Sequence, residues 1–124
     1  MTGTDLFSQH LVQVRGVEGF MVLRNDGHIL THNIEQAEKF ASLATLSGIS
    51  VQGVQKKLGF MPFRHLVFSR EHNRSLIVFP LDKFYVGIFA KVGFNLSEII
   101  EDVNKFLLKI KIKKNPGHSP KEEE

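Results

Sequence analysis

The chain has 124 residues, of which 42% are hydrophobic, and its formal net charge is +3. These values predict one globular domain over residues 1–114 and a disordered tail over residues 115–124. The chain has no cysteine, which excludes disulfides, thiolate catalysis and zinc–thiolate sites. No run of 18 apolar residues occurs and no signal-like segment opens the chain, so we expect no membrane span and a cytoplasmic location.

The distribution of charge argues against nucleic acid as a partner. Acidic residues are scattered along the chain, and the one dense basic cluster falls at the end of a predicted helix, at Lys109, Lys111, Lys113 and Lys114. Cations at that position complement the negative end of the helix dipole. We therefore interpret the cluster as stabilising the helix rather than binding phosphate.

In chain order, residues 4–14 form the first predicted helix because their apolar residues recur at helical spacing. Residues 19–32 form a β-hairpin around the turn Asn25-Asp26-Gly27. Asn33 is the expected N-cap of a long helix that ends near Leu58, with Gln36 completing a capping box.

Three further strands are predicted at residues 63–70, 75–81 and 84–92. Their connections are too short for parallel crossovers, so they form an antiparallel meander. Asn95 then caps a final helix, whose apolar stripe runs from Leu96 to Ile110.

The apolar residues of the strands are consecutive rather than alternating, as in Phe20-Met21-Val22-Leu23 and Leu76-Ile77-Val78-Phe79. Both faces of the sheet must therefore be covered. We predict an α/β (α+β) fold of order α-β-β-α-β-β-β-α, in which a five-stranded antiparallel sheet lies between the long central helix and the two terminal helices.

The strand at residues 63–70 is more polar than the others and is the expected single free edge of the sheet. A free edge can pair with a second copy of the chain, and interior glycines can let two helices approach closely. We therefore predict a homodimer whose interface contains Phe63, His65, Val67 and Ser69 of this strand and Leu46 and Gly48 of the long helix.

The order of elements and the stretch Val17-Glu18-Gly19-Phe20-Met21-Val22-Leu23-Arg24-Asn25-Asp26-Gly27-His28-Ile29-Leu30 resemble the roadblock/dynein light chain domain family. The strand Ser75–Leu81 resembles the family's strand before the last hairpin, and the resemblance covers residues 6–112. It implies a roadblock/profilin-like fold, a homodimer joined through the edge strand and long helix, and regulation or scaffolding of a small Ras-like GTPase. On this basis we assign Leu43, Ser50, Gly53 and Lys57 to the partner-binding surface.

No residue pattern predicts catalysis. The sequence contains no phosphate loop of the type Gly-x-x-x-x-Gly-Lys-Ser/Thr, and its serines and histidines form no triad. His28 and His32 lack a third metal ligand. We therefore expect no catalytic residue, no metal and no cofactor. The alternative interpretation is a small-molecule-sensing module of the PAS or profilin-like kind, which would require an internal pocket.

Overall fold

The computed structural model describes residues 3–114 and the side chains of residues 7–109; the predicted tail lies outside the described residues. The elements are α1 (Gly3–Gln13), β1 (Val17–Arg24), β2 (Ile29–His32), α2 (Ala37–Leu58), β3 (Leu66–Arg70), the short 3-10 helix η1 (Glu71–Asn73), β4 (Arg74–Leu81), β5 (Phe84–Ala90) and α3 (Leu96–Lys114). The predicted order of helices and strands is confirmed.

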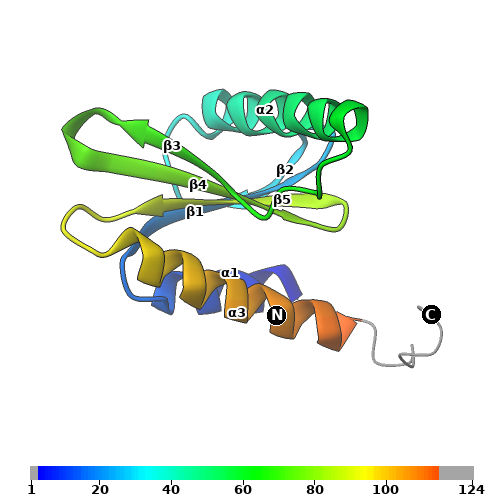
Figure 1. The fold of residues 1–124 in the computed structure, drawn as a ribbon. Coiled ribbons are helices and arrows are strands. Elements are labelled where there is room, and N and C mark those ends of the chain that lie inside the picture. The colour runs from blue at the N-terminus through cyan, green and yellow to red at the C-terminus, as the bar shows by residue number, and fades with distance from the viewer. Residues whose placement is uncertain (1–2, 115–124) are drawn as a thin grey trace.

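The five strands form one antiparallel sheet in the order β2-β1-β5-β4-β3. Helix α2 covers one face, and α1 and α3 lie side by side on the other (Figure 1). The sheet has two edges, β2 and β3, so the prediction of a single free edge was wrong. The overlooked edge strand β2 has only four residues, and short strands are one way in which proteins protect an edge.

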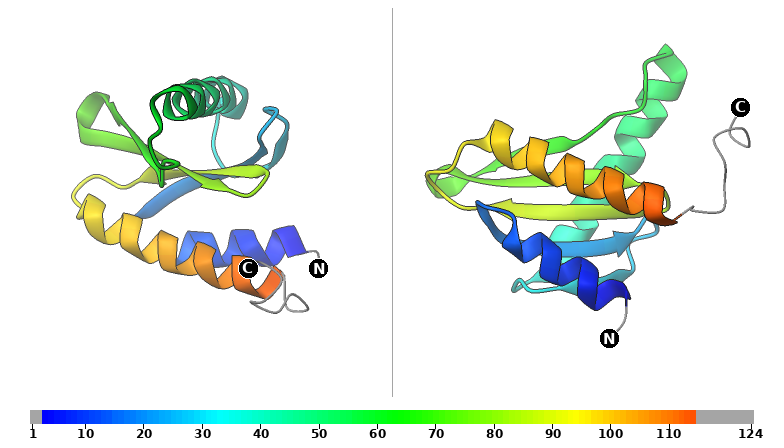
Figure 2. Two further views of the ribbon diagram at one scale, coloured as in Figure 1. Left: turned by 45° about the vertical axis from the view of Figure 1, so that its right-hand side comes forward. Right: turned by 90° about the horizontal axis from the view of Figure 1, so that it is seen from below.

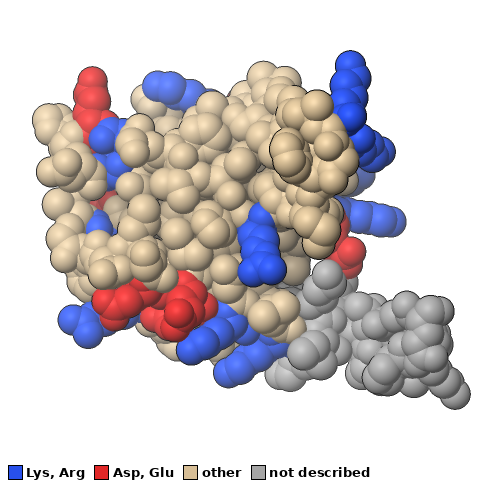
Figure 3. Space-filling view, viewed as in Figure 1, with Lys and Arg blue, Asp and Glu red and all other residues tan. Residues whose placement is uncertain are grey.

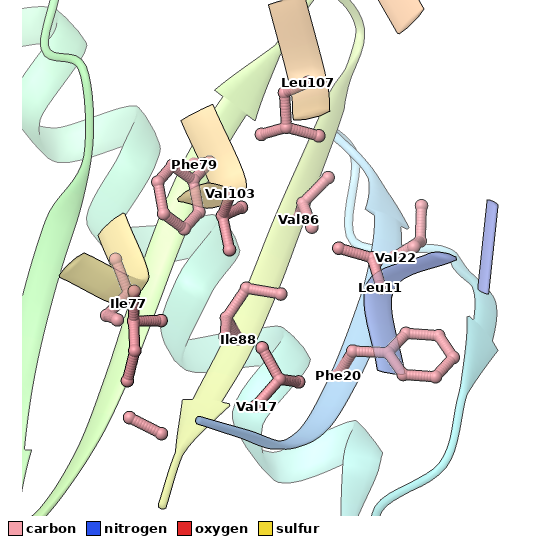
Figure 4. Packing of buried hydrophobic residues seen from close by; sticks show 12 residues of the cluster. Leu11, Val17, Phe20, Val22, Ile77, Phe79, Val86, Ile88, Val103 and Leu107 are labelled. Carbon is pink, nitrogen blue, oxygen red and sulfur yellow. The ribbon is translucent and has the colours of Figure 1, made fainter. Parts of the chain in front are cut away.

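Alternate residues of each central strand enter opposite layers of the core, because successive side chains of a strand point to opposite faces. Phe20, Val22 and Ile88 pack beneath α1 and α3 with Leu11, Val103 and Leu107 (Figure 4). Met21, Leu23 and Phe89 pack beneath α2. The consecutive apolar residues of the sequence therefore have the predicted cause, a sheet covered on both faces.

The hairpin turn and the cap of the last helix are as predicted. Gly27 adopts a φ of 99°, a conformation that glycine tolerates best. The backbone N–H of His28 donates a hydrogen bond to Asp26 Oδ1 at 3.0 Å and lowers the pKa of Asp26. At α3, the backbone N–H of Glu98 donates to Asn95 Oδ1 at 3.1 Å.

Asn33 does not cap α2, so this prediction was wrong. Its Oδ1 accepts a hydrogen bond of 2.8 Å from the backbone N–H of Phe20 and joins the loop to β1. The helix begins four residues later, after Gln36, which has a φ of 58° and makes no side-chain capping hydrogen bond. An asparagine can satisfy a backbone group outside a helix as well as at its start, and here the sheet provides the donor.

Strand β3 is shorter than predicted, because it starts at Leu66 rather than at residue 63. Leu66 pairs with Val78, so a ladder continued by two residues would place Arg64 opposite Pro80. Proline has no N–H to donate to a neighbouring strand. Phe63 and His65 therefore precede the strand, and their assignment to it was wrong.

Candidate partner interface along helix α2 and strand β3

Helix α2 extends past the sheet that supports it. Its 22 residues span about 33 Å, but its buried residues all lie between Ala37 and Gly48. Leu46, Ser47, Ser50 and Val51 lie beside β3, and no residue from 49 to 58 is buried. In the right-hand view of Figure 2, the C-terminal part of α2 extends beyond the border of the sheet. About half of the helix is therefore left without a sheet beneath it.

Helix α2 and the segment that follows it expose large apolar side chains. Leu46, Leu58 and Phe60 are exposed by 66%, 62% and 67%, and Met61 by 82%. Leu43, Ile49 and Val54 are also exposed. We call these seven residues the α2 surface. In Figure 3 the surface over α2 and β3 carries few Lys, Arg, Asp or Glu side chains, and most of those charges lie around its border. A concentration of large exposed apolar side chains on one helix is typical of protein interfaces.

A groove of about 400 Å³ separates α2 from the edge strand and is lined by Leu46, Ser47, Ser50, Val51, Leu66, Val67 and Phe68. Strand β3 pairs only with β4, so its other side presents main-chain donors and acceptors to a further strand. Val67 and Ser69 are exposed on this strand. The α2 surface, the groove and the β3 edge thus form one continuous candidate interface.

Apart from Gly48, the predicted helix residues fall on two neighbouring exposed stripes. Leu46, Ser50, Gly53 and Lys57 follow each other at intervals of four, three and four residues, which places them on one face of the helix. Leu43 starts the adjacent stripe with Ser47, Val54 and Leu58. Although Leu46 was assigned to the dimer and the other three to a partner, the structure brings these four residues together.

Gly48 points into the protomer rather than toward its surface. A Cβ placed on this glycine would lie 2.6 Å from Tyr85 Cζ and still closer to the tyrosine hydroxyl. The group that approaches this glycine is a side chain of the same sheet, and not a second helix. Burial beneath α2 also raises the pKa of Tyr85. For Gly53, by contrast, no atom of the described part of the chain lies within 4 Å of such a Cβ, and this glycine is on the exposed face of the helix.

Phe63 and His65, which precede β3, contact other residues of the same protomer. Phe63 packs against the core layer beneath α2. The His65 ring lies 6.0 Å from the ring of Phe79, and its buried Nδ1 has no hydrogen-bond partner among the described residues. Neither residue belongs to the exposed edge in the way that Val67 and Ser69 do.

The sequence does not predict the exposure of Ile49, Val54 and Leu58 in the α2 surface. At helical spacing, Val54 and Leu58 continue the apolar stripe of Ala37, Ala41 and Ala44, so the pattern alone places them on the side of the helix that faces the core. Their exposure depends on where the sheet ends beneath the helix, which their spacing does not encode. The cluster of Phe60, Met61 and Phe63 around Pro62 is the sequence signal for an exposed partner anchor, and Phe60 and Met61 are exposed in the structure.

The described residues contain no cluster of three or more His, Asp or Glu side chains suited to a metal. His32 Nδ1 is hydrogen-bonded to the carbonyl oxygen of Ile34 at 2.9 Å. No helix among them is long and apolar enough to cross a bilayer. The geometry of the interface suits association with another polypeptide.

Comparison with solved structures identifies the fold. No protein-family model matches the sequence, and no curated protein matches it either. The gliding protein MglB from Thermus thermophilus matches with a TM-score of 0.72 at 14% identity, over 95% of this chain and 96% of that chain. A roadblock/LC7 domain from Streptomyces avermitilis matches with a TM-score of 0.61 at 15% identity, over 82% and 93%. The chain therefore has the roadblock/LC7 fold.

Within this fold, the MglB structures match over nearly the whole chain. A second MglB structure, described as having a tetrameric arrangement, gives a TM-score of 0.73 at 12% identity over 90% of each chain. The predicted roadblock-like architecture is thereby confirmed at the level of fold.

Proposed function

We propose that the protein is a homodimeric interaction module that binds a small Ras-like GTPase and regulates or scaffolds it, without catalysing a reaction itself. The observation that carries the proposal is the α2 surface together with the unpaired β3 edge. The roadblock/LC7 fold supports the choice of a GTPase as the partner, because the resemblance to that family implies this class of partner.

The geometry favours a second copy as the group that covers the β3 edge. A strand added to β3 by the partner subunit would continue the sheet beneath the unsupported half of α2. By two-fold symmetry, the partner's helix would cover this subunit in the same way. One contact would then pair the open edge and bury apolar residues such as Leu58, which together stabilise the assembly.

The face of α2 that points away from the sheet is the proposed GTPase-binding surface. It carries Ser50, Gly53 and Lys57 on one stripe, and in the proposed dimer two such faces lie next to each other. A partner seated there would contact both protomers. Leu46 begins the same stripe, so this leucine contributes to GTPase binding as well as to the groove beside β3.

Two measurements test the two levels of the proposal. Light scattering should give the mass of a dimer at micromolar concentration, and co-purification should retain a small Ras-like GTPase, with the GTP-loaded and GDP-loaded forms compared.

Leu46→Asp should weaken one or both associations while leaving the circular dichroism spectrum unchanged. Leu108→Asp is the matched control, since Leu108 is 59% exposed on α3, across the sheet from α2.

A monomeric mass for the wild-type protein would refute the dimer. Equal loss of association in Leu46→Asp and Leu108→Asp would remove α2 from the proposed surface. Failure to retain any small GTPase in either nucleotide state, with the dimer intact, would refute the choice of partner and leave the homodimer standing.

A further inference from the structure

A polar cleft of about 420 Å³ lies where the turn between β3 and β4 meets the start of α2. Arg70 and Arg74 line it together with Glu18 and Glu35, and the rings of Phe40 and Phe89 form its apolar wall. The cleft is separate from the groove beside β3. It still borders the candidate interface, because Arg70 is the last residue of β3 and Phe40 lies on α2.

Arg70 is held in place by the aromatic wall. Its guanidinium carbon lies 5.0 Å from the centre of the Phe40 ring and 5.4 Å from that of Phe89. The two rings contact each other edge to face at 5.0 Å. These cation–π contacts position the guanidinium against the aromatic wall, and its N–H donors lie in its own plane. Among the described residues, no carboxylate lies within 4.0 Å of this guanidinium, so an ordered set of donors is available to a ligand.

Arg74 places a second positive charge beside the first. Arg70 and Arg74 are directly opposite each other in the β3–β4 ladder, so their side chains lie on the same face of the sheet. Like charges in this relation repel and destabilise a strand pair. No carboxylate within 4.0 Å neutralises Arg74 either, within the part of the chain that the structure describes. An anion bound between the two arginines would remove this repulsion.

The other two charged residues of the cleft limit which anion it accepts. Glu18 and Glu35 line the same space, so the formal charges of the four side chains sum to zero. A phosphate with nearly two negative charges would be repelled by both carboxylates. A carboxylate carries a single charge and matches the two-pronged donor geometry of arginine.

We propose that this cleft binds the side-chain carboxylate of an Asp or Glu residue on a partner protein, with Arg70 as the two-pronged donor and Arg74 as the second cation. The inference rests on the proposed function for the existence of that partner. The ordered guanidinium loses little conformational freedom on binding, which is the property that makes arginine effective at the centre of interfaces. Arg70 is thus the residue that determines preference for an acidic contact.

The first experiment uses the isolated protein and small probes, so its outcome does not depend on the GTPase. Nuclear magnetic resonance would follow the arginine Nε–H signals during titration with N-acetylglutamate α-amide, which carries only the side-chain carboxylate. The neutral N-acetylglutamine α-amide and inorganic phosphate are the comparison probes. The carboxylate should shift the Arg70 and Arg74 signals in a saturable way, the glutamine analogue should not, and phosphate should bind more weakly than the carboxylate.

Variants separate recognition from nonspecific attraction of anions. Arg70→Lys keeps the charge but loses the planar donor pair, so carboxylate affinity should fall roughly tenfold. Glu35→Gln should strengthen phosphate binding relative to carboxylate. Equal shifts with the glutamine analogue, wild-type binding of phosphate as strong as that of carboxylate, or unchanged affinity in Arg70→Lys would each overturn the proposal.

The second experiment places the site in the complex. Arg70→Lys should weaken retention of the GTPase while the solution mass of the dimer stays the same. If the small carboxylate binds in the first experiment but Arg70→Lys leaves GTPase retention unchanged, the cleft binds free carboxylates and the role in partner recognition is refuted.

Discussion

Two glycines of α2, five residues apart, provide a matched test of how the helix lies on the sheet. Gly48 faces Tyr85, whereas Gly53 faces open space. Substitution by alanine improves helix propensity at both positions by about 1 kcal/mol. Any difference in stability between Gly48→Ala and Gly53→Ala therefore comes from the surroundings of the added methyl group and not from intrinsic helix propensity.

The structure sets the size of that difference. At position 48 the new Cβ would lie 2.6 Å from Tyr85 Cζ, and overpacking of this kind costs about 1–3 kcal/mol. Gly48→Ala should therefore be neutral or destabilising by as much as about 2 kcal/mol, while Gly53→Ala should stabilise the protein by about 1 kcal/mol. For a domain of this size, each kcal/mol corresponds to roughly 4 °C in the melting temperature.

Thermal denaturation followed by circular dichroism measures both effects, with all variants compared at one protein concentration because self-association shifts the apparent stability. Tyr85→Phe removes the hydroxyl that lies closest to the added methyl, so Gly48→Ala should be less destabilising in that background. Equal stabilisation by the two alanine variants would refute the packing of Gly48 against Tyr85 and, with it, the seating of α2 on the sheet.

Three further predictions follow from particular contacts. Burial raises the pKa of Tyr85, so the free energy of unfolding that this shift contributes below a pH of about 10 should be lost as the pH rises toward the folded-state pKa. Because the chain has one tyrosine, tyrosinate absorbance reports this ionisation directly. The pH dependence should disappear in Tyr85→Phe. Asn33→Ala should cost about 1–2 kcal/mol in urea denaturation, because the Phe20 N–H loses its acceptor. Asn95→Ala should cost about 1 kcal/mol through loss of the α3 cap, and an unchanged denaturation midpoint would show that this cap contributes nothing.

The sequence is a good guide to the fold because its local signals agree with one another. The turn around Gly27, the cap at Asn95 and the strands that are apolar on both faces each depend on neighbouring residues alone. Asn33 and Phe63 were misassigned because their partners come from distant segments. Asn33 accepts a hydrogen bond from a backbone N–H of β1, and the pairing of β3 ends where Pro80 of β4 would lie opposite. Neither relation can be predicted from residues that are adjacent in the sequence.

The candidate interface could be predicted only in outline. An edge strand beside a long helix follows from the order of elements, and Leu46 and Val67, which the sequence assigned to the dimer interface, are exposed in the structure. The exposure of Val54 and Leu58 depends on the width of the sheet relative to the length of α2, which is a property of the assembled fold. The contact of Arg70 with Phe40 and Phe89 joins three separate elements, so no single pattern in the sequence indicates it.

The sheet supports only the first half of α2, so the backbone amides of the two halves should differ in their protection from exchange with solvent. Backbone amides between Ala37 and Gly48 are anchored by the sheet, whereas those between Ile49 and Leu58 depend on their own helical turns and on what covers them. If the proposed dimer forms, the second half of the helix should exchange its amide hydrogens quickly at low protein concentration and slowly at high concentration. The equilibrium between the folded and locally unfolded forms of residues 49–58 would then be coupled to binding of a partner. The folded fraction of this segment would rise with protein concentration.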